Sequence, residues 1–208
     1  FPVFPLYEDV IQFTARSGIG YTGTLLVTYG GPWGENYFFT HDDPHDDPKV
    51  NRFMPHTVVD GRTKRVPWFR EEEYAFPEIA ASALDIQRAG GFVGVGSHGQ
   101  FQGLGYHWEL WALAEGSDDP MEALQAATIG GAHVIGHETE VGSIEVGKFA
   151  DLLVLDSDPR ENIRNTADIY RVMMNGRLYD DDALDQEWPE EKALPDLWFA
   201  DQGPPGAD

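Results

Sequence analysis

The chain has 208 residues and a formal net charge of −22, from 36 Asp and Glu against 14 Lys and Arg. This balance argues against nucleic-acid partners and anionic membranes, which need basic side chains, and no apolar run approaches the ~18 residues of a transmembrane helix. A hydrophobic content of 41% is typical of a folded domain, and the absence of cysteine excludes disulfides, thiolate catalysis and cysteine metal ligands.

The first part of the chain predicts helices alternating with short strands. Residues 6–17 have apolar positions at helical spacing, and Gly18 can end that helix. Residues 24–29 (TLLVTY) and 92–95 (FVGV) are short apolar runs that predict buried strands, with a helix over 77–89 between them. Because helices separate the strands, we expect parallel βα units whose strands end on the same face.

A polar, proline-rich stretch of residues 30–70 separates the first strand from the next helix. Insertions of this length are typical of lids or binding loops. It contains the tetrapeptide HDDP twice, at residues 41–48, and these side chains can bind a divalent cation. A solvated loop without a metal is the alternative interpretation.

Two further helices are expected after the second strand. The first runs through residues 107–115, and the second starts at Asp119, with Pro120 in its first turn. The pair Gly130-Gly131 is expected to interrupt the second helix.

The pattern changes after residue 142 and favours a small antiparallel module. Residues 150–155 predict a strand, and YRVMMNGRLY predicts two more strands joined at Asn175-Gly176, a strong hairpin signal. Residues 180–208 are acidic with Lys192 as the only base, so we expect a solvated, partly disordered tail. Trp188 and Trp198 indicate that part of this tail packs against the body.

Histidine is the main candidate for chemistry. His98 directly follows the predicted strand, where a neutral imidazole can ligate a metal or move a proton; a hydrogen-bonded loop histidine is the alternative. His107 and Glu109 follow at the predicted start of a helix, where Glu109 suits the helix dipole and His107 can orient the loop. His133 and His137 have i,i+4 spacing, but no HExxH motif accompanies them, so surface or capping roles are favoured.

A phosphate-binding loop is not favoured. The stretch GGFVGVGSHGQFQGLG is rich in glycine but lacks a GxGxxG turn and a Walker lysine. No basic residue lies between Arg88 and Lys148.

Several segments resemble the amidohydrolase superfamily. GSIEVGKFADLLVLD followed by RVMMNGRLY resembles its C-terminal signature. VGVGSHGQFQGLGYHWELWALAEG with PMEALQAATIGGA resembles the last barrel strand, its loop and the following helices. TLLVTYGGPWGENYFF and the start FPLYEDV resemble the imidazolonepropionase- and prolidase-like subgroup, which often carries an N-terminal TolB-type propeller. The resemblance covers roughly residues 1–179.

The resemblance implies an α/β fold: the C-terminal portion of a (β/α)8 TIM barrel plus strands of the small composite β-sandwich. Residues 1–140 would form the last two βα units, with 30–70 as an insertion; 141–179 would form sandwich strands, and 180–208 the acidic tail. Such a barrel needs ~250 residues, so we expect the missing N-terminal part of the barrel, or another chain, to complete it.

The resemblance also implies hydrolysis of a C–N bond in an amide, a cyclic amide or an Xaa-Pro dipeptide by metal-activated water. The expected cofactor is a divalent metal, Zn2+, with most ligands upstream of this chain. Where the family usually has Asp after the last strand, this sequence has His98, which is therefore the implied catalytic residue and metal ligand. The implied substrate pocket contains Tyr29, Trp33, Glu35, Asn36, Ser97 and His107.

The chain alone is expected to be inactive, and the complete protein to be a homo-oligomer acting on a small molecule. The propeller-bearing relatives suggest a periplasmic or secreted protein. The alternative function is a non-catalytic fragment that acts in assembly.

Overall fold

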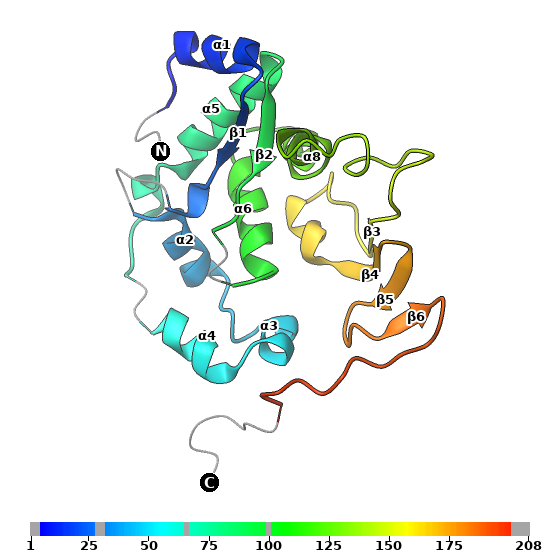
Figure 1. Ribbon diagram of the computed structural model, residues 1–208. Helices are drawn as coiled ribbons and strands as arrows, with labels where there is room; N and C mark the ends of the chain where they lie inside the picture. The colour runs from blue at the N-terminus through cyan, green and yellow to red at the C-terminus, as the bar shows by residue number, and fades with distance from the viewer. Residues whose placement is uncertain (1–4, 28–31, 65–66, 99–100, 201–208) are drawn as a thin grey trace.

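The computed structural model describes residues 5–27, 32–64, 67–98 and 101–200 (Figure 1). Its centre is a parallel pair of short strands, β1 (Gly20–Gly23) and β2 (Phe92–Val95), in register from Gly20 opposite Phe92 to Gly23 opposite Val95. The parallel βα arrangement predicted from the sequence is therefore confirmed.

The strand predicted over residues 24–29 is wrong for residues 24–27, and residues 28 and 29 lie outside the described ranges. The strand lies earlier, and Leu25–Val27 form a 3₁₀ turn whose two leucines are buried. The amides of Leu25 and Leu26 donate to the carboxylate of Glu109 instead of a neighbouring strand. A short apolar run predicts that its side chains are buried, but it does not by itself distinguish a strand from another buried element, and here the buried element is a turn.

Helices cover the parallel pair. The predicted helix over residues 6–17 is confirmed as α1 (Glu8–Ser17), which ends at Gly18 with φ 73°. The helix predicted over 77–89 is confirmed as α5 (Phe76–Arg88), and the next is α6 (Leu104–Ala114). Both contact β2, and the core between them contains buried residues of each helix and of β2: Leu84, Ile86, Val93, Trp108 and Ala112.

Gly130 and Gly131 do not interrupt the helix that follows Asp119. α7 (Pro120–Gln125) continues through a π-helical turn, Ala126–Gly130, into α8 (Gly131–Val134). The two glycines instead allow close approach to β2, because a Cβ at Gly130 would meet the carbonyl oxygen of Val93.

The insertion between the first strand and α5 is largely helical over its described residues. It forms α2 (Gly34–His41), α3 (Pro48–Phe53) and α4 (His56–Thr63), and α3 and α4 lie beyond α2 and α6 at one end of the molecule (Figure 1). Pro48 starts α3, and Asp47 caps it by accepting bonds from the next two amides at 2.8 and 2.9 Å. Phe38 of α2 stacks on Trp108 of α6, so the insertion shares the core.

A separate antiparallel sheet has the order β3 (Leu152–Leu155), β4 (Ile169–Met174), β5 (Arg177–Asp180) and β6 (Gln186–Trp188). The hairpin at Asn175-Gly176 is confirmed, with positive φ at both residues (48° and 73°). β6 pairs with β5, so the sheet extends into the segment expected to be the acidic tail.

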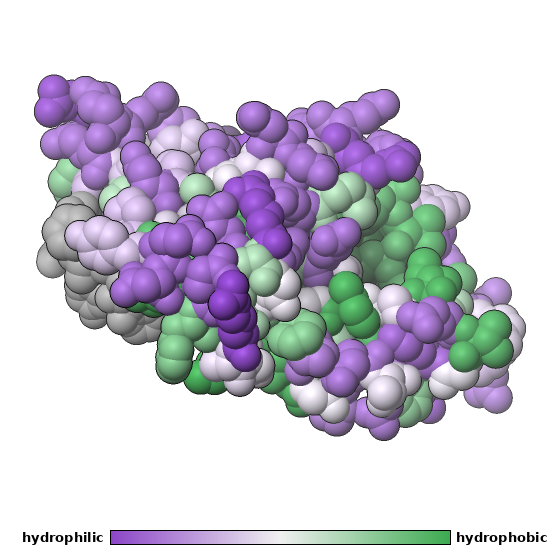
Figure 2. Space-filling view, turned by 90° about the horizontal axis from the view of Figure 1, so that it is seen from above, coloured by the Kyte–Doolittle hydropathy of each residue, from purple (hydrophilic) through white to green (hydrophobic). Residues whose placement is uncertain are grey.

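Apolar side chains are exposed on this sheet. Leu153, Tyr170, Met174 and Trp188 are each about half exposed. Figure 2 shows apolar residues at the surface on the side where Figure 1 draws both this sheet and the loop between α8 and β3. Within the described ranges, no helix is long and apolar enough to cross a membrane.

The close packing at Gly130 gives a stability prediction. Gly130→Ala should destabilise the fold by about 1–3 kcal/mol, because the new methyl group has no room beside β2. Gly61→Ala is the control: nothing lies within 4 Å of its Cβ position in α4, so it should be stabilising by about 0.5–1 kcal/mol. Urea unfolding measures both, and equal midpoints would contradict the packing described here.

Candidate functional site

The carboxyl ends of the two parallel strands meet at one place. A Cβ at Gly96 would lie 2.8 Å from the carbonyl oxygen of Gly23, so the residues after β2 are pressed against the end of β1. Ser97 and His98 follow immediately and are both exposed. In parallel α/β folds this edge is where ligands bind, so the position of His98 suits the role predicted for it.

Glu109 connects the end of β1 to α6. Its carboxylate accepts bonds from the amides of Leu25 and, at 3.2 Å, Leu26, and the residue is 1% exposed. Burial, with a smaller contribution from the charge of Glu35, raises the pKa of Glu109 to about 8, although the hydrogen bonds from the two amides lower it. Because α6 begins at Leu104, Glu109 lies in mid-helix and not at the helix start expected from the sequence.

A second buried carboxyl lies at the start of α2. Glu35 is 5% exposed, and its Oε1 is buried without a hydrogen-bond partner among the described residues. Burial raises the pKa of Glu35 to about 7, and the nearby charge of Arg62 partly offsets this. At neutral pH Glu109 is therefore mostly protonated and Glu35 partly protonated.

The other expected pocket residues divide into two places. Trp33, the N-cap of α2, is half exposed, and its carbonyl accepts the amide of Asn36, which is half-buried, at 2.9 Å. Tyr29 lies outside the described residues. His107 points elsewhere: its Nδ1 lies 3.2 Å from the hydroxyl of Thr166.

His107 lines a cavity of about 270 Å3 between α3, the start of α6 and β4. Lys49 and Asp181, an ion pair at 3.1 Å, line the same cavity. Burial lowers the pKa of His107, and the charge of Lys49 lowers it further. His107 therefore belongs to the contact between α6 and the 3₁₀ helix Ile163–Ala167 that precedes β4, because Thr166 also accepts Trp111 Nε1 at 3.0 Å.

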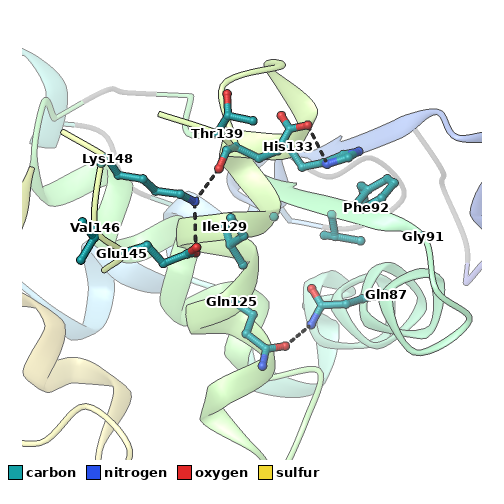
Figure 3. Close-up of a pocket in the computed structure, with 14 residues that line it drawn as sticks. Gln87, Gly91, Phe92, Gln125, Ile129, His133, Thr139, Glu145, Val146 and Lys148 are labelled. Atoms are coloured by element: carbon teal, nitrogen blue, oxygen red, sulfur yellow. Dashed lines mark hydrogen bonds and ion pairs between the residues drawn. The ribbon is translucent and has the colours of Figure 1, made fainter. Parts of the chain in front are cut away.

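A larger cavity, of about 670 Å3, lies at the opposite end of β2 (Figure 3). Phe92 and His133 stack at its edge, and Lys148 extends into it. The ammonium of Lys148 donates to the Glu138 carbonyl at 2.5 Å and lies 3.3 Å from the Glu145 carboxylate. Lys148 thus holds the loop before β3, and the cavity is remote from the strand end where His98 lies.

Metal-donor side chains converge at one group in the part of the chain that the structure describes. The ligand atoms of His45, His56 and Asp60 all lie within 4.8 Å of one another, and His98 is not among them. His133, which is half-buried against Phe92, instead pairs with Glu138 at 3.6 Å, and the exposed His137 pairs with Glu140 at 2.5 Å.

Two of these features were missed by sequence reasoning. From the sequence, Glu109 was expected only at the start of a helix. Its position as the one acid in the apolar helical stretch HWELW was the signal that could have revealed a buried carboxyl. The i,i+4 spacing of His56 and Asp60 was also readable, but their approach to His45 depends on the fold of the insertion.

The sequence model of the Amidohydrolase family matches residues 69–179, which is more than half of the chain. The chain belongs to the amidohydrolase family. Members of this family generally depend on a divalent metal. The matched segment contains β2, His98, α6, Glu109 and the antiparallel sheet as far as β5.

Curated amidohydrolase relatives match short segments. An imidazolonepropionase of Symbiobacterium thermophilum is 43% identical over 67 residues, 31% of this chain and 16% of that protein. A 5-methylthioadenosine/S-adenosylhomocysteine deaminase of Thermoanaerobacter pseudethanolicus is 37% identical over 70 residues, 28% of this chain and 16% of that protein. The match therefore spans about a sixth of the length of each relative.

Solved structures show the same fold over most of this chain. A Xaa-Pro dipeptidase with bound methionine aligns with a TM-score of 0.52 at 22% identity, covering 85% of this chain and 38% of the other. A crystal structure of an amidohydrolase gives 0.54 over the same shares, also at 22% identity. The expected fold, part of an amidohydrolase barrel with a separate antiparallel sheet, is confirmed.

The raised pKa of Glu109 predicts a pH-dependent stability. The native state keeps the proton up to pH of about 8, whereas the unfolded chain releases it near 4.5, so the stability contributed by this group falls as pH rises between these values. Glu109→Gln should flatten the decline in free energy of unfolding between pH 5 and 8. Glu115→Gln, which removes an exposed carboxyl at the end of the same helix, is the control; identical slopes in both variants would contradict the burial effect.

Proposed function

We propose that this chain is the C-terminal part of a metal-dependent amidohydrolase that hydrolyses a C–N bond in a small molecule. The observation that carries the proposal is the position of His98, three residues after the end of the second of two parallel strands and within the segment that matches the family. The alternative from the sequence, a non-catalytic assembly fragment, is an outcome of the test below.

The names of the similar proteins support an amide-like substrate. They include imidazolonepropionases, an N-substituted formamide deformylase of Arthrobacter pascens and, among solved structures, a Xaa-Pro dipeptidase. We therefore propose cyclic amides and Xaa-Pro dipeptides as the first substrates to examine.

The proposed cofactor is Zn2+ at the carboxyl ends of the strands. His98 suits it because an exposed imidazole after a strand is a good zinc donor, but the described residues supply no group of three donors that includes it. The remaining ligands would come from outside this chain. When bound, such a metal lowers the pKa of a water molecule and polarises a carbonyl.

The residues of this chain would bind and orient the substrate beside that metal. Trp33 offers an exposed aromatic face and Ser97 an exposed hydroxyl. Glu35 is proposed to hold a proton, since its pKa of about 7 leaves it partly protonated at neutral pH and its Oε1 has no described partner. Glu109 is a positioning residue, because it fixes the turn after β1.

The proposed partner is the missing N-terminal part of the barrel. β1 and β2 pair only with each other in the described part of the chain, and parallel strands are normally paired and covered on all sides. The exposed apolar residues of the antiparallel sheet also offer a surface that such a partner would cover. The homo-oligomer and the periplasmic or secreted location expected from the sequence stay predictions.

The proposal is tested on the intact protein, including the segment upstream of this chain. Zinc-loaded protein is assayed with a panel of Xaa-Pro dipeptides, N-substituted formamides and cyclic amides. His98→Ala should lower kcat/KM by about 10²–10⁴-fold, the range for loss of a group that transfers a proton.

His137→Ala is the control, since this exposed histidine pairs with Glu140 and should leave turnover unchanged. Unchanged turnover in His98→Ala would overturn the assigned role. A metal-loaded protein that hydrolyses no member of the panel would favour the non-catalytic alternative.

A further inference from the structure

The turn that precedes α3 and the first turn of α4 bring two histidines around one carboxylate. Nε2 of His45 lies 3.0 Å from Oδ1 of Asp60, and Nδ1 of His56 lies 3.2 Å from Oδ2 of the same residue. His56 and Asp60 are four residues apart on α4, so they share a face of the helix. Asp60 thus lies between the two rings.

These separations are close to those of a metal site. Ligand atoms about 2.0–2.2 Å from a tetrahedral zinc lie about 3.3 Å from one another. One ligand atom from each of the three residues lies within 4.8 Å of the other two. The nitrogens of His45 and His56 lie 3.0 and 3.2 Å from the two different oxygens of Asp60, within a few tenths of an ångström of the spacing of about 3.3 Å around zinc. Small rotations of the side chains would direct all three at one ion.

Asp43 orients the ring of His45. In metal-binding histidines the ring nitrogen that does not bind the metal is usually held by a carboxylate or a carbonyl in this way. Oδ1 of Asp43 lies 2.9 Å from Nδ1 of His45 and also accepts the His45 amide at 3.0 Å. The carbonyl of His45 accepts Asn51 Nδ2 at 2.5 Å. These contacts fix the ring with its other nitrogen toward Asp60, which is the carboxylate–histidine–metal arrangement.

We propose that His45, His56 and Asp60 bind one divalent transition-metal ion, with Zn2+ the best fit, and that Asp43 supports the site through His45. Two imidazoles and one carboxylate favour zinc over calcium or magnesium, which prefer oxygen ligands. The ion would hold α4 against the turn that precedes α3. This site is independent of the function proposed for His98.

The test is zinc binding by the chain after removal of metal with a chelator. The number of zinc ions per chain is measured by inductively coupled plasma mass spectrometry, and the zinc affinity is measured by titration against a competing chelator. His56→Ala and Asp60→Asn should each lose one equivalent of zinc relative to the wild type. Asp43→Asn should keep the site but weaken it about 10–100-fold, the usual effect of changing such a supporting group.

His137→Ala is the matched control, because it removes an exposed histidine that also pairs with an acid. It should bind as much zinc as the wild type. Equal zinc content and affinity in His56→Ala and in this control would overturn the proposal, as would equal affinity of the wild type for Mg2+ and Zn2+. Circular dichroism reports folding, and if His56→Ala does not fold, unchanged affinity in Asp43→Asn overturns the site.

Discussion

The short parallel pairing of β1 with β2 is the constraint on which the rest of the structure depends. It places the ends of both strands side by side, so that His98 follows one strand and the Leu25–Val27 turn follows the other. Helices α5 and α6 contact this pair, and their buried side chains form the core. The pair also leaves strand edges that bond to no other strand in the described ranges, which is why we propose a barrel partner.

Glu109 links this framework to the chemistry of the site. Its carboxyl takes the two amides that a longer β1 would have given to a neighbouring strand, and so ends the strand and fixes the following turn. Burial raises the pKa of both acids, to about 8 for Glu109 and about 7 for Glu35, so Glu109 is mostly protonated and Glu35 partly protonated near neutral pH. Titratable groups with pKa values shifted by burial are typical of sites that bind or transfer a proton.

Local patterns predicted the elements whose stability is local. Gly18 ends α1, and the hairpin at Asn175-Gly176 uses the positive φ that these residues tolerate. The strand predicted at 24–29 failed because its amides are bonded by Glu109, more than eighty residues away in sequence. The approach of His45 to Asp60 could not be predicted from the sequence either. Pro48 and Pro55 start two helices in a stretch that had been expected to be a loop, and these helices bring the two residues together.

Hydrogen–deuterium exchange tests the central claim most directly, that β1 and β2 are the last strands of a barrel completed by upstream sequence. The amides of Gly20–Gly23 and Phe92–Val95 are compared in this chain alone and in the protein with its upstream segment. We expect slower exchange of these amides in the longer protein, because new strand pairs and burial protect them. Equal exchange in both forms would contradict the claim.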